Sequence, residues 1–192
     1  MTTHPRTEKI YITYKTRMTT EARLRLTGKV SHLLLSWYSF WIIAISVIEL
    51  SGKYTFANSQ VVVTAMSVLI FGLSLFIYGE RYDDKANQFR NCYLDLQELY
   101  ESSLDENAKM EQYAKILRIY ENQSDRDYDN MLFDARIRGQ SLNNAQGKLS
   151  ITNEMFVILL VKRLSVLIAV TLLFIAPPWI IVTFINVVSQ AG

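Results

Sequence analysis

The side chains that could do acid–base or metal chemistry are clustered, but not in a catalytic pattern. Acidic residues gather at Asp83-Asp84 and again at Asp125, Asp127 and Asp129, with Arg and Lys residues between and beside them. Carboxylates interleaved with cations are typical of a solvated, salt-bridged helix face. These clusters therefore favour a charged helix surface over a metal site.

Nucleophiles and imidazole groups are scarce. The sequence has two histidines, His4 and His32, and one cysteine, Cys92. These residues cannot form a His-centred triad, a zinc site or an internal disulfide. The sequence also lacks a glycine-rich phosphate loop, a nucleophile elbow and a CxxC pair. We therefore expect that the chain is not an enzyme and needs no cofactor.

Hydroxyl side chains recur at helical spacing inside two apolar segments. Ser39 and Ser46 lie in the first segment, and Thr64, Ser67 and Ser74 lie in the second. One interpretation is that these hydroxyls line a path for water or ions between copies of the chain. The other is helix packing, because hydroxyl groups form hydrogen bonds across helices in lipid. The sequence leaves both open.

Glu49 is the only formal charge in either apolar segment. At the outer membrane boundary it could pair with Lys53. In a ring of subunits it would form a ring of carboxylates, an arrangement that favours cations at a pore mouth. The candidate pore-lining residues are therefore Ser39, Ser46, Glu49, Thr64, Ser67 and Ser74.

The elements that must position these residues are two membrane-spanning helices. The segments 31–50 and 60–79 are each long enough for a helix of about 30 Å, the thickness of the hydrocarbon core. Aromatic residues such as Trp37, Tyr38 and Tyr78 accompany them, as is usual for membrane spans. Residues 31–79 are therefore predicted to form a transmembrane hairpin.

Charge sets the predicted orientation of this hairpin. Residues 1–30 carry seven Lys and Arg against two Glu, whereas the loop 51–59 carries only Lys53. Basic residues that flank a span favour the cytoplasmic side. The N-terminus is therefore expected inside and the loop outside.

The region 80–153 is predicted to form a cytoplasmic helical bundle. Apolar positions recur with steps of three and four in residues 80–105, a helix expected to continue directly from the second span, and again around Tyr113–Tyr120. Such stripes must be buried between helices or between subunits. Residues 139–150 are rich in Gly, Asn and Ser and are predicted to be a connector.

The last segment, 154–192, is strongly apolar. Lys162 and Arg163 would be costly at mid-membrane, so they are placed at the inner interface, with 164–188 as a third span and the C-terminus outside. Pro177 and Pro178 are expected to kink or split this helix. A re-entrant or surface-lying segment is the alternative.

The fold class predicted is all-α. The chain is expected to be an integral membrane protein with four parts. These are a basic cytoplasmic N-terminal helix (1–30), a two-span hairpin (31–79), a cytoplasmic helical region (80–153) and a third hydrophobic segment (154–192).

The layout and several motifs resemble one family. A basic helix containing TEARLRL leads into two spans, followed by RNCYLDLQELY and by AKILRIYENQSDRDYDNMLF. Over roughly residues 15–140 this is similar to the SLATT proteins, two-transmembrane effectors associated with SMODS nucleotidyltransferases and SLOG domains in bacterial conflict systems. The most specific part is Tyr120-Glu121-Asn122 followed by Asp127-Tyr128. Gln123 stands where many relatives have His.

The resemblance implies an oligomeric, pore-forming or membrane-perturbing effector of bacterial antiviral (abortive-infection) defence in the inner (cell) membrane. It implies a linked sensor as trigger, either a nucleotidyltransferase or a reverse transcriptase, the latter associated with a branch that carries a third hydrophobic segment. A cyclic nucleotide ligand is left open. The candidate assembly or signal-sensing residues are Tyr93, Leu96, Tyr100, Tyr120, Glu121, Asn122, Asp127 and Tyr128. The alternative function is a non-conducting membrane adaptor whose cytoplasmic helices bind a partner.

Overall fold

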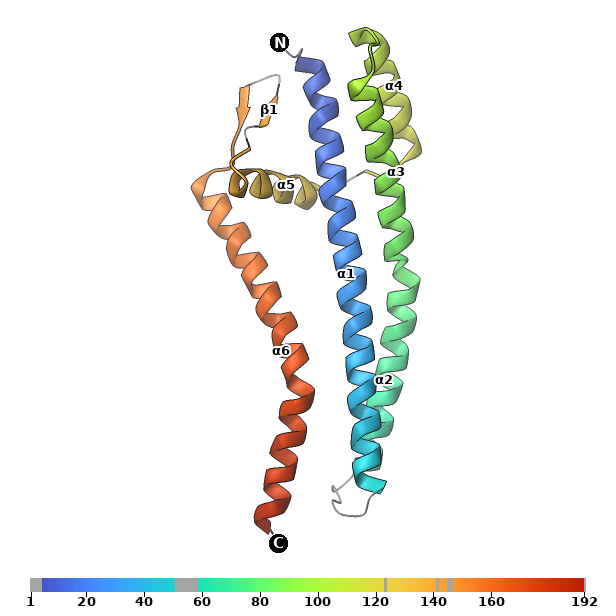
Figure 1. The fold of residues 1–192 in the computed structure, drawn as a ribbon, viewed down its shortest axis with the longest axis vertical. Helices are drawn as coiled ribbons and strands as arrows, with labels where there is room; N and C mark the ends of the chain where they lie inside the picture. The colour runs from blue at the N-terminus through green and yellow to red at the C-terminus, as the bar shows by residue number, and fades with distance from the viewer. Residues whose placement is uncertain (1–4, 51–58, 123, 141, 145–146, 192) are drawn as a thin grey trace. The chain divides into compact units, whose positions relative to one another are not determined.

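The fold is known from a computed structural model, which describes residues 5–50, 59–122, 124–140, 142–144 and 147–191. Figure 1 shows the chain as a series of helices with one short β-hairpin between the fifth and sixth. The elements in order are α1 (Pro5–Leu50), α2 (Ser59–Glu80), α3 (Tyr82–Glu101), α4 (Glu106–Ile119), α5 (Asp125–Ile137), β1 (Leu142–Asn144), β2 (Gly147–Leu149) and α6 (Asn153–Ala191). The predicted all-α membrane fold is confirmed.

The described residues fall into two compact units, and α1 contributes to both. The first unit contains residues 1–27 and 82–162 and is here called the cytoplasmic unit, after the side of the membrane on which the sequence analysis expects it. The second, the membrane unit, contains residues 28–81 and 163–192. The basic N-terminal helix therefore packs with the helices that follow the second span.

The helices α3 and α4 are antiparallel neighbours in the cytoplasmic unit (Figure 1). The helix α4 starts at a well-formed cap, where the Asp105 carboxylate accepts hydrogen bonds from the backbone N–H groups of Asn107 and Ala108 at 3.1 and 3.3 Å. This cap satisfies donors that have no partner within the helix. Part of the stripe predicted from the sequence is buried here, where Leu96 of α3 and Tyr113 of α4 pack with Leu99 and with Ile10 of α1.

A second apolar cluster joins α5 to the β-hairpin and to the beginning of α6. Phe133 is almost fully buried and stacks on Phe156, with ring centroids 4.9 Å apart. The hairpin pairs Leu142 with Leu149 in antiparallel register, and Gly147 has a φ of 121°, which favours glycine. Residues 139–150, predicted as a connector, thus include a hairpin that adds Leu142 to this core.

The helix α3 does not continue directly from α2, contrary to the sequence expectation. Arg81 separates them with a φ of 50°, in the left-handed region. A non-glycine residue in this conformation costs roughly 1–2 kcal/mol. The backbone N–H of Arg81 donates to the carbonyl of Tyr78 at 3.3 Å, which closes α2 with a turn.

The membrane unit exposes apolar side chains almost throughout its length. The described residues include three helical stretches long and apolar enough to span a membrane, one in α1, one beginning in α2 and one in α6. Val61, Phe71 and Leu167 are each more than 60% exposed on the chain alone. In water this surface would be unfavourable, whereas lipid or further copies of the chain would cover it.

Candidate functional site

The predicted pore-lining hydroxyls of α1 are half-buried and bonded within their own helix. Ser39 Oγ donates to the carbonyl of Leu35 at 2.8 Å, and Ser46 Oγ donates to that of Ile42 at 2.9 Å. Such bonds satisfy the hydroxyl hydrogen in an apolar medium and leave the oxygen free to accept. The side chain of Glu49 is also half-buried, and its predicted partner Lys53 lies outside the described residues.

The hydroxyls of α2 behave in the same way but are more exposed. Thr64 and Ser67 are exposed and Ser74 is half-buried. They donate to the carbonyls of Gln60, Val63 and Phe71 at 2.7 to 2.8 Å. Each hydroxyl can therefore face lipid, another helix or water without an unsatisfied donor. Intrahelical bonds of this kind are compatible with both helix packing and a lumen.

The helix α6 runs as one helix through Pro177 and Pro178, so the proline pair does not split it, which was one of the two outcomes that the sequence predicted. Two carbonyls near the prolines receive hydrogen bonds from α1. Trp37 Nε1–H donates to the carbonyl of Phe174 at 2.9 Å, and Tyr38 Oη–H donates to that of Leu173 at 3.0 Å. These contacts connect the first and third apolar helices within the membrane unit.

Asp127, a predicted sensing residue, fastens α5 to α1. Its carboxylate is 1% exposed and accepts from Arg23 Nε at 2.7 Å and Arg23 Nη2 at 3.2 Å. The hydroxyl of Ser124 donates to the same carboxylate at 2.8 Å. Burial alone would raise the pKa of Asp127, but the hydrogen bonds from Arg23 and Ser124 hold it below its usual range. The carboxylate is therefore ionised at neutral pH.

Tyr120 connects the end of α4 to α3. Its hydroxyl donates to Asp95 Oδ2 at 2.8 Å, and this bond raises the pKa of Tyr120 to about 12. Glu121 and Asn122, which follow Tyr120, are both exposed. Gln123 lies outside the described residues. Tyr120 is thus bound to α3, whereas the next two residues are exposed to solvent.

The remaining predicted sensing residues are distributed over the core and its edge. Leu96 is fully buried inside one chain, and Tyr93, Tyr100 and Tyr128 are half-buried. Tyr100 packs near Tyr11, with ring centroids 5.6 Å apart. The stripe of α3 is thus covered largely by helices of the same chain, and Leu96 is unavailable as a contact between subunits in this state.

Arg17 is a residue that sequence reasoning missed. It is fully buried, and its three guanidinium nitrogens have no oxygen or nitrogen acceptor among the described residues, while the thiol of Cys92 is a polar neighbour. The guanidinium carbon lies 5.7 Å from the ring centroid of Phe89. Burial raises the pKa of the nearby Cys92 thiol to about 11, although the positive charge of Arg17 acts in the opposite direction. Only its place in a basic helix marks Arg17 in the sequence, and this gave no signal of burial.

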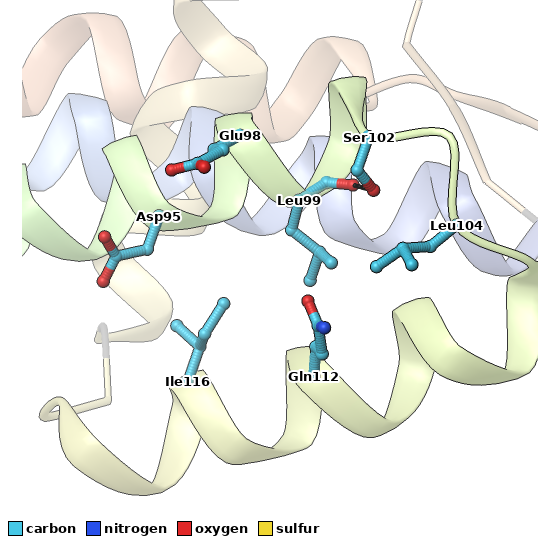
Figure 2. Close-up of a pocket in the computed structure, with 7 residues that line it drawn as sticks. All are labelled: Asp95, Glu98, Leu99, Ser102, Leu104, Gln112 and Ile116. Atoms are coloured by element: carbon cyan, nitrogen blue, oxygen red, sulfur yellow. Dashed lines mark hydrogen bonds between the residues drawn. The ribbon is translucent and has the colours of Figure 1, made fainter.

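An open pocket lies between α3 and α4, and Figure 2 shows the side chains around it. Leu99, Leu104 and Ile116 give it an apolar part, while Asp95 and Glu98 bring carboxylates. This combination suits a basic, partly aliphatic group. Among the described residues, no group of three or more His, Cys, Asp or Glu side chains is placed to hold a metal ion.

The fold and the apolar surface define a helical membrane protein with two compact units, one of which contains the three apolar helical stretches. Residues 6–186 match the family described as SMODS and SLOG-associating 2TM effector domain family 5, so the chain belongs to this SLATT family. The match extends beyond the roughly 15–140 covered by the resemblance and includes most of α6. Comparison with curated proteins found no match, and comparison with solved structures found none either.

Membership of the family implies a membrane effector in antiviral systems. The three motifs that carried the resemblance also meet in the structure. Arg23 of TEARLRL binds Asp127 of the Asp127-Tyr128 pair, and Asp95 of YLDLQELY binds Tyr120. The motifs therefore hold together the helices of the cytoplasmic unit.

Proposed function

We propose that the chain assembles into an oligomer that opens a pore in, or otherwise perturbs, the bacterial cell membrane, as the effector of an abortive-infection system. The observation that carries the proposal is the membrane unit, which exposes apolar side chains for lipid and places hydroxyls on both α1 and α2. Three helices cannot enclose a lumen by themselves, so the lumen would lie between copies.

The proposed orientation has the N-terminus inside and three spans. The basic residues of 1–30, together with Lys162 and Arg163, support this orientation through the preference of cations for the cytoplasmic side. The cytoplasmic unit would then receive the signal of a linked sensor, either a nucleotidyltransferase or a reverse transcriptase. We propose no catalytic role for the chain itself.

The hydroxyls of α2 provide the test. Overproduced protein should depolarise the host membrane, and Ser67→Leu combined with Ser74→Leu should abolish this effect, because leucine replaces a group that can contact water by one that prefers lipid. Val62→Leu combined with Val68→Leu is the matched control, since it exchanges one exposed apolar residue of α2 for another. Its effect should equal that of the unchanged protein.

Depolarisation that survives the double serine change, at normal expression and insertion, would place the lumen on another face. Absence of depolarisation by the unchanged protein would favour the alternative, a non-conducting adaptor. The pocket beside Asp95 and Glu98 is then the surface on which a basic partner would be sought.

A further inference from the structure

The two proline residues of α6 leave two particular carbonyls without their helical donors. In an α-helix the carbonyl of residue i accepts from the N–H of residue i+4. Proline has no N–H, so Pro177 deprives the carbonyl of Leu173 and Pro178 deprives that of Phe174. In the hydrocarbon core no water can replace the missing donors, and an unsatisfied backbone group there costs several kcal/mol.

The structure supplies a substitute donor for each of these carbonyls. Tyr38 Oη–H lies 3.0 Å from the carbonyl oxygen of Leu173, and Trp37 Nε1–H lies 2.9 Å from that of Phe174. Two consecutive residues of α1 thus serve the two consecutive carbonyls that the prolines have freed. This correspondence also explains why α6 stays helical through the proline pair.

We propose that Trp37 and Tyr38 form a latch that holds the third span on the first, with the proline pair as its other half. The latch consists of single side-chain hydrogen bonds, which can be exchanged for bonds to water, unlike the bonds inside a helix. When α6 moves away, the carbonyls of Leu173 and Phe174 need new donors. Release is therefore favourable only when water reaches this depth of the membrane.

This last step rests on the proposed pore function, whereas the latch does not. In a conducting state the two carbonyls would face the hydrated path, where backbone carbonyls are suitable ligands for cations. In the closed state Trp37 and Tyr38 cover them. The latch would thus couple the position of the third span to the hydration of the membrane interior.

A double-mutant cycle tests the latch in the full chain. Trp37→Phe with Tyr38→Phe removes both donors and keeps aromatic rings in place. Pro177→Ala with Pro178→Ala restores the helical donors. In the chain that keeps Pro177 and Pro178, the two phenylalanine substitutions should lower the midpoint of thermal unfolding in detergent. In the chain with both prolines replaced by alanine, the same two substitutions should change this midpoint little.

The chain offers a matched control for the tryptophan. Trp41 lies one turn after Trp37, with ring centroids 5.5 Å apart, but its buried indole N–H has no acceptor among the described residues. Trp41→Phe should therefore cost no hydrogen bond, and its effect should be the same in both backgrounds. The latch is supported if the effect of replacing Trp37 and Tyr38 depends on the two prolines while the effect of replacing Trp41 does not.

An equal fall in both backgrounds would overturn the latch, because it would show that packing of the rings, and not the donors, was lost. Membrane depolarisation separates the two parts of the account. Increased depolarisation by Trp37→Phe with Tyr38→Phe, reversed when Pro177→Ala and Pro178→Ala are added, supports release of the third span as a step in opening. Coupled stability without depolarisation by any variant would keep the latch and contradict the pore function.

Discussion

At the scale of single residues, the ion pair between Arg23 and Asp127 links α1 to α5 within the cytoplasmic unit. It joins helices that are 104 residues apart in sequence, and its carboxylate is almost fully buried. No local pattern marks this pair, because both residues lie among charges of the kind usual on a solvated helix. Sequence reasoning could select Asp127 through the family motif but could not find its partner.

Asp127→Asn should destabilise the cytoplasmic unit by roughly 1–3 kcal/mol, since Arg23 would lose an ionic acceptor at a buried position. Chemical unfolding followed by circular dichroism measures this loss. Glu111→Gln is the control, because Glu111 and Lys115 form an exposed pair whose loss should leave the stability almost unchanged. Equal effects of the two changes would contradict the role of Asp127.

The low pKa of the Asp127 carboxyl predicts that the stability of the folded chain depends on pH. Its pKa is lower in the folded chain than the value of about 3.9 usual for an unfolded Asp. The contribution of Asp127 is therefore complete above that unfolded pKa and is lost as the pH falls through the folded pKa. Unfolding midpoints measured from pH 7 downward should fall more steeply below about pH 4 for the unchanged chain than for Asp127→Asn.

Arg17 leads to the opposite expectation. A buried guanidinium with no oxygen or nitrogen acceptor carries a desolvation cost, and even buried ion pairs can often be replaced by apolar residues of similar size with a gain in stability. Arg17→Met should therefore raise the unfolding midpoint of the full chain. Arg17→Lys keeps the buried charge and should give no such gain. A large loss of stability in Arg17→Met would show that the guanidinium is paired.

At the scale of elements, the sequence predicted the helices well and their junctions less well. Apolar length and periodicity identified the spans within 31–50 and 60–79 and the amphipathic helices after them, because these features repeat over many residues. The break at Arg81 and the continuity of α6 through Pro177 and Pro178 depend on single backbone groups. The partners of those groups lie elsewhere in the chain, so a local pattern could not reveal them.

The helix α3 provides a test of where its apolar stripe is buried. Leu96 is fully buried and Leu94 is 46% exposed on the same helix. Leu96→Asp should unfold the cytoplasmic unit, because an unpaired charge enters an apolar core at a cost of several kcal/mol. Leu94→Asp should leave it folded. Circular dichroism and size-exclusion chromatography in detergent would distinguish unfolding from simple dissociation of an oligomer. A folded, merely dissociated Leu96→Asp chain would place Leu96 between subunits instead.

At the scale of the whole molecule, the distribution of charge predicts the topology. We expect an odd number of spans, with the C-terminus outside. A reporter active only in the cytoplasm, fused after Gly192, should give no signal, while the same reporter fused before residue 1 should be active. Strong signal from the C-terminal fusion would instead indicate that 164–188 re-enters the membrane or lies on its surface.

The most direct test of the account is the release of a small dye from sealed liposomes that contain the purified full chain. We expect release by the unchanged protein, greater release by Trp37→Phe with Tyr38→Phe, and little release by Ser67→Leu with Ser74→Leu at equal insertion. Liposomes that stay sealed with both the unchanged protein and the aromatic variant would contradict the pore.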